Sequence, residues 1–161
     1  MDSYISSLGY DFLSKDIELP LTLQKIVYSE FITENDIIVL GEVHGSGNPS
    51  YENDLKKCEF EYNETHFHPD AFADKGNGEI EYLKLALECA KRLIGRLDKN
   101  FKDKKFRVLV SFSETEIKDG EIESYGSSTV RFYQIRSSCE RIMRMEDLNS
   151  FKIEAILEIE N

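Results

Sequence analysis

The stretch EIEYLKLALECAKRLIGRLDKNF, residues 79–101, decides the fold of this chain. Its apolar residues recur at alternating steps of three and four, a spacing that places them on one face of an α-helix. These residues are Ile80, Leu83, Leu87, Ala90, Ile94, Leu97 and Phe101. The opposite face is basic and we expect it to be solvated. It carries Lys84, Lys91, Arg92, Arg96 and Lys99.

Elsewhere, alternation of apolar and polar residues predicts β-strands with one buried face and one wet face. The predicted strands occupy residues 37–43, 58–62, 106–112, 130–133 and 152–160. Asp119-Gly120 lies between strand segments at 105–115 and 121–135, which is the usual place for a hairpin turn. The sequence therefore predicts an α+β fold in which a mainly antiparallel sheet of about five strands packs on the long helix.

The first 36 residues predict one or two further helices. The second would begin at Pro20, because proline suits the first turn of a helix. Its inward-facing residues would be Leu23, Ile26, Val27 and Phe31. A length of 161 residues, without internal repeats, predicts a single domain over residues 1–161.

The charge of the chain is strongly negative and unevenly distributed. The net charge is −11, and residues 1–78 alone carry 15 acids against 5 bases. Such a field disfavours binding to nucleic acid or to anionic membrane and favours a basic partner. We also expect neither a membrane span nor a secretory signal, because the sequence has no long apolar run and its first residues lack a basic region followed by an apolar one. Cys58, Cys89 and Cys139 form no CxxC pair, which is typical of free thiols in a reducing cytoplasm.

The predicted hairpin at residues 114–123 is the most acidic short segment, with five acids and one lysine. We expect it to protrude from the sheet and to bind a basic protein, together with carboxylates of the 58–62 strand. The predicted partner-binding residues are Glu114, Glu116, Asp119, Glu121, Glu123, Glu59 and Glu61.

In size, acidity and lack of a complete catalytic motif, the chain resembles bacterial immunity proteins. That resemblance implies a cytoplasmic antitoxin that binds and neutralises a cognate toxin, often a basic nuclease, without a cofactor. Charge complementarity would speed the capture of such a partner. This is our leading hypothesis, and it assigns no catalytic residue.

A second hypothesis rests on the histidines. If a strand continues through residues 64–70, the polar side chains at every second position share one face, and a His-x-His pair with a carboxylate can bind Zn²⁺. With the histidine that ends the 37–43 strand, the candidate ligands are His44, Glu64, His66, His68 and Asp70.

The strand end Val39-Leu-Gly-Glu-Val-His-Gly45 resembles the opening motif of the erythromycin-esterase, TraB and ChaN-like hydrolase group. In that group the Glu and His of the motif serve the active site, and the matching positions here are Glu42 and His44. The match covers about nine residues, and the further His and Glu motifs of those longer enzymes are not found. The alternative function is therefore a metal-dependent hydrolase that uses Glu42 and His44 with His66 and His68.

Overall fold

A computed structural model of the chain describes residues 17–34, 36–42, 59, 65–67, 78–137 and 154–161. These residues form an α+β fold with antiparallel sheets, as the sequence predicts. The elements are α3 (Leu21–Tyr28), β1 (Phe31–Glu34), β2 (Ile37–Leu40), β3 (Thr65–Phe67), α6 (Ile80–Asn100), β4 (Lys105–Ser113), β5 (Glu116–Lys118), β6 (Glu121–Ser124), β7 (Ser127–Ile135) and β8 (Glu154–Glu160).

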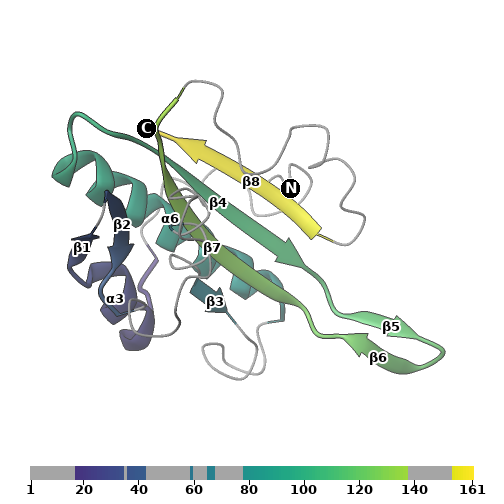
Figure 1. Cartoon of the computed structure of the whole chain (residues 1–161). Helices are drawn as coiled ribbons and strands as arrows, with labels where there is room; N and C mark the ends of the chain where they lie inside the picture. Colours follow the sequence, from purple (N-terminus) through teal and green to yellow (C-terminus); the bar gives the residue numbers. More distant parts are fainter. Residues whose placement is uncertain (1–16, 35, 43–58, 60–64, 68–77, 138–153) are drawn as a thin grey trace.

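The main sheet has the strand order β3-β7-β4-β8, and every neighbouring pair is antiparallel. Its centre is the pair of nine-residue strands β4 and β7, whose register places Val110 opposite Val130. Figure 1 shows α6 lying across one face of these two strands, which it contacts directly. The predicted arrangement of one long helix on an antiparallel sheet is confirmed.

The hydrophobic core lies between α6 and this sheet face. Leu83 and Leu97 of α6 are completely buried, as are Phe106 of β4 and Phe132 of β7. The rings of Phe106 and Phe132 meet edge to face, with centroids 6.3 Å apart. Burial of this apolar surface is the main stabilising term of such a fold. The helix and the sheet therefore stabilise one another.

The opposite face of the sheet differs from the prediction of a wet surface. Tyr133 is completely buried there, and Arg107 and Leu109 are only 3% and 5% exposed. Arg107 donates a hydrogen bond to the Tyr133 hydroxyl at 2.9 Å and pairs with Glu160 of β8. A buried guanidinium is tolerated because it is paired in this way. Sequence alternation counts arginine as solvated, which is why the prediction was wrong at these positions.

The N-terminal described segment agrees with the prediction in part. Helix α3 begins directly after Pro20, and Leu23 and Val27 are buried on its inner side. Phe31, however, begins strand β1 and is not helical. Strand β1 forms a hairpin with β2. Glu59 has helical backbone, which contradicts the predicted strand at that position.

Two arginines of α6 join this helix to α3, which corrects the prediction of a fully solvated basic face. Arg96 donates hydrogen bonds to the carbonyls of Val27 and Ser29, the latter at 2.7 Å. Arg92 donates to the Tyr28 hydroxyl at 3.0 Å. The last carbonyls of a helix lack partners within the helix and attract cations. Arg96 therefore satisfies carbonyls at the C-terminal end of α3, and Arg92 holds the Tyr28 side chain beside α6.

No helix within the described ranges is long and apolar enough to cross a membrane.

Replacement of Leu83 by alanine tests the core. Leu83 is 0% exposed, so we expect the free energy of unfolding to fall by about 2–5 kcal/mol. The same change at Leu21, which is 77% exposed, is a matched control and should alter the free energy of unfolding by less than about 0.5 kcal/mol. Urea unfolding of both variants measures the difference. Equal losses would contradict the packing of α6 on the sheet.

Candidate functional site

The predicted acidic hairpin is present and is formed by strands β5 and β6. We call residues 114–125 the acidic arm. Strands β5 and β6 of the arm continue the direction of β4 and β7, and Figure 1 shows them projecting beyond the end of the main sheet. Four of its five carboxylates are exposed, and Glu116 is partly exposed. The arm therefore extends the two central strands of the main sheet.

The turn at the tip of the arm has the backbone geometry that a tight hairpin needs. Asp119 and Gly120 both have positive φ angles, 53° and 85°. Two consecutive residues of this kind are characteristic of the type I′ turn, for which Asp-Gly is a preferred sequence. The prediction of a hairpin turn at this dipeptide is confirmed.

The arm has two chemically different faces. Ile117 and Ile122 are register partners, so their side chains lie on the same face of the ribbon. Lys118 and Glu121 are the next partners and lie on the other face, where Lys118 also approaches Glu123 at 3.7 Å. Both side chains of this ion pair are more than half exposed, so it adds little stability.

The apolar face of the arm is exposed to solvent. Ile117 is 69% exposed, Ile122 is 51% exposed, and Tyr125 near the base is 69% exposed. We did not identify these residues from the sequence as part of a site. The available signal was the alternation of isoleucine with charged residues on both sides of Asp119-Gly120.

The base of the arm is fastened to the start of α6 by Glu79. Its carboxylate accepts hydrogen bonds from the Thr115 backbone N–H, at 2.8 Å, and from the Thr115 hydroxyl. The same hydroxyl accepts a hydrogen bond from the Gly126 backbone N–H at 2.9 Å. One carboxylate and one threonine thereby connect both ends of the arm to the helix.

Gly126 leaves the space at this base that the Glu79 carboxylate occupies. A Cβ atom there would lie 2.6 Å from the Glu79 carboxyl carbon and 2.8 Å from each carboxylate oxygen. Such distances are too short for non-bonded atoms. The absence of a side chain at residue 126 therefore allows Glu79 to reach Thr115.

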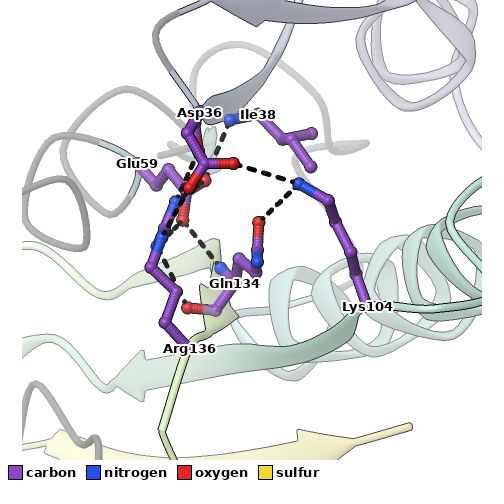
Figure 2. A network of polar contacts seen from close by, with 6 residues as sticks. All are labelled: Asp36, Ile38, Glu59, Lys104, Gln134 and Arg136. Carbon is purple, nitrogen blue, oxygen red and sulfur yellow. Dashed lines mark hydrogen bonds and ion pairs between the residues drawn. The ribbon is translucent and has the colours of Figure 1, made fainter.

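A second polar cluster surrounds Glu59 and is shown in Figure 2. The Glu59 carboxylate accepts hydrogen bonds from the backbone N–H groups of Ile38, at 2.9 Å, and Gln134, at 2.7 Å. Arg136 donates to both Glu59 oxygens, at 2.8 and 3.0 Å. The two-point geometry is that of a strong charge-assisted pair. This cluster joins β2 to β7 through a residue that belongs to neither strand.

The outer part of the same cluster is formed by Asp36, Lys104 and Gln134. The Lys104 ammonium donates to the Asp36 carboxylate at 3.3 Å and to the Gln134 side-chain oxygen at 3.0 Å (Figure 2). The hydrogen bond and positive charge of Lys104, with a smaller contribution from Arg136, lower the pKa of Asp36 below its ordinary value of 3.8. Asp36 is largely exposed, so the contacts are those of a surface network.

Glu59 is therefore not the exposed binding carboxylate that the sequence suggested. Its side chain is 0% exposed, and both oxygens are occupied by contacts within the chain. A carboxylate in this position holds the fold together and contributes no accessible charge to a partner. Its partner Arg136 is distant in sequence, so no local pattern could have revealed the pairing.

The remaining predicted residues are only partly within the described chain. Glu61 of the acidic set, and His44, Glu64, His68 and Asp70 of the possible zinc site, lie outside the described residues. His66 is in β3, where its register partner is Thr129 of β7. Glu42 is exposed just after β2. Among the residues that the structure describes, no three histidine, cysteine, aspartate or glutamate side chains are placed to hold a metal ion.

Cys89 is a free thiol, as the sequence predicts, and it is buried in the core. Burial raises the pKa of its thiol to about 12. The reactive thiolate is therefore scarce at neutral pH, and the side chain acts as a small apolar group. Cys58 and Cys139 lie outside the described residues.

Replacement of Glu59 by glutamine tests the buried pair. It would remove the charge beside Arg136 and replace one hydrogen-bond acceptor with a donor, so we expect the free energy of unfolding to fall by about 1–3 kcal/mol. The same change at the exposed Glu18 should have an effect below about 0.5 kcal/mol. Chemical unfolding at pH 7 measures both, and an unchanged midpoint for the Glu59 variant would refute the role of the pair.

Replacement of Gly126 by alanine tests the base of the arm. The new Cβ should displace the Glu79 carboxylate from Thr115 and loosen the arm while the main sheet stays ordered. NMR order parameters of residues 116–124 should fall relative to those of β4 and β7. Gly95 has open space around it, so Gly95→Ala is the control and should leave the arm unchanged. An arm of unaltered order in Gly126→Ala would contradict this account.

Comparison with known proteins gives a family but no characterised relative. No curated protein and no solved structure matches the chain. One family model matches it over residues 1–161, and its description is "Uncharacterized protein PM0498 family". That match includes the acidic arm, the Glu79 contact and the Glu59 cluster alike. Because it spans the whole sequence, the chain belongs to the Uncharacterized protein PM0498 family.

Proposed function

We propose that this chain is an acidic protein-binding domain that uses its acidic arm to capture a basic protein. The observation that carries the proposal is the projection of the arm beyond the sheet, with Glu114, Asp119, Glu121 and Glu123 exposed. A ribbon in this position can contact a partner without any rearrangement of the core. Its carboxylates face solvent and are available to lysine and arginine side chains.

The charge of the whole chain supports the same function. A net charge of −11 attracts a cationic protein over distances comparable to the Debye length, about 8–10 Å at physiological salt. It repels the phosphates of nucleic acid and of anionic lipid. Electrostatic attraction of this kind chiefly raises the association rate.

The partner that fits these properties is a basic toxin, most simply a nuclease, whose binding surface for nucleic acid is itself cationic. The chain would then act in the cytoplasm as an immunity protein that covers this surface. Rapid capture matters for such a protein, because a free nuclease damages the cell before equilibrium is reached. On this proposal, the gene immediately upstream encodes a larger protein that ends in the toxin domain.

Charge reversal in the acidic arm tests the function. We expect Glu114→Lys with Glu121→Lys to slow association with the purified toxin domain of the upstream gene by roughly tenfold at low salt. Both side chains are exposed, so the thermal stability of the chain should not change. Stopped-flow fluorescence at several salt concentrations measures the association rate.

The matched control is Glu18→Lys with Asp98→Lys, which changes the net charge equally at exposed positions on other elements. It should slow association much less than the change in the arm. Failure of the unmodified chain to bind that domain would overturn the immunity function. Equal effects of the two double variants would show that the partner does not meet the arm.

A further inference from the structure

The acidic arm carries an uncovered apolar pair as well as charge. Ile117 and Ile122 are direct cross-strand neighbours beside the tip, and each is more than half exposed. An isolated two-stranded ribbon is marginally stable in water, and one cross-strand aliphatic pair adds only about 0.2–1 kcal/mol to it. Charged residues on both faces would keep the ribbon more soluble. The pair therefore needs an explanation beyond folding.

We propose that Ile117 and Ile122 are the anchor of the acidic arm, and that they enter an apolar recess whose rim carries lysine and arginine on a cationic protein. This inference rests on the proposed function and deepens it by naming the chemistry of the contact. Buried apolar groups supply the affinity at the centre of an interface, while charges at its rim mainly affect the association rate and the choice of partner.

The acidic residues around the two isoleucines favour a cationic protein as the partner. The segment 114–123 has five acids and one lysine, so a cationic rim satisfies the carboxylates while the isoleucines are buried. A second copy of the chain would bring two arms of the same sign together. An anionic membrane surface would be repelled in the same way.

The construction of the arm favours an anchor at this place. The Asp119-Gly120 turn fixes the tip, and the Glu79–Thr115 contact fixes the base. The two isoleucines are therefore held side by side before binding. A group that is already ordered loses less conformational entropy when it binds, which raises the affinity obtained from each buried side chain.

The test replaces both isoleucines by threonine, which keeps the β-branched shape and the strand preference of the ribbon. We expect Ile117→Thr with Ile122→Thr to raise the dissociation rate from the toxin domain of the upstream gene by about 30-fold. The association rate and its salt dependence should stay close to those of the unmodified chain. Surface plasmon resonance measures both rates, and circular dichroism confirms an unchanged fold.

The control is Leu21→Gln, which removes another exposed apolar side chain, 77% exposed on α3, and should leave both rates unchanged. An unaltered dissociation rate for the threonine variant, with normal binding by the unmodified chain, would overturn this inference and leave the proposed function standing. No binding by the unmodified chain would overturn both. A concentration-dependent dimer that the threonine variant loses, seen by light scattering, would assign the pair to self-association and refute the cationic partner.

Discussion

The fold depends above all on the contact between the apolar face of α6 and the inner face of β4 and β7. The most deeply buried side chains of the described chain gather at this contact, and α3 and β2 add to the same core from one side. Apolar burial is non-directional, so it favours compactness but does not determine exactly where the smaller elements lie. Their placement falls to a few directional polar contacts. The arginines of α6 bind the end of α3, Glu59 and Arg136 hold β2 beside β7, and Glu79 holds the arm.

These polar contacts share a physical principle. In each, a charged side chain satisfies backbone groups that would otherwise lack partners or meet water, and it does so across a long distance in the sequence. Glu59 is the clearest example, because a fully buried carboxylate is tolerated only when its oxygens are hydrogen-bonded and its charge is compensated. Loss of Arg136 would leave the Glu59 carboxylate buried with two backbone hydrogen bonds but without a compensating charge. Apolar burial thus stabilises the main sheet. The charged side chains determine where α3, β2 and the acidic arm attach to the core.

The sequence correctly predicted the elements whose apolar residues recur at a regular spacing. The 3.6-residue spacing predicted α6, alternation predicted β4, β7 and β8, and Asp-Gly predicted the tip of the arm. It was not sufficient where a polar residue is buried by a distant partner. Arg107 appears solvated in any local window, and its burial becomes intelligible only with Tyr133 and Glu160 beside it. Glu59 was predicted to be an exposed binding residue for the same reason, because its partner Arg136 is distant in the sequence. Only part of the candidate site was predicted. Its carboxylates were identified by their charge. The pairing of the two exposed isoleucines became visible only with the register of β5 and β6.

The attachment of the arm has a consequence for how this family can diversify. Residues 116–125 contribute no side chain to the core cluster of the described chain, so their identity is nearly independent of the stability of the remainder. Only the junction at Thr115, Gly126 and Glu79 has to be kept for the arm to hold its direction. Substitutions on the ribbon can therefore accumulate with little effect on the stability of the scaffold. If the arm binds a partner as proposed, a few substitutions on the ribbon would change its specificity without altering the scaffold.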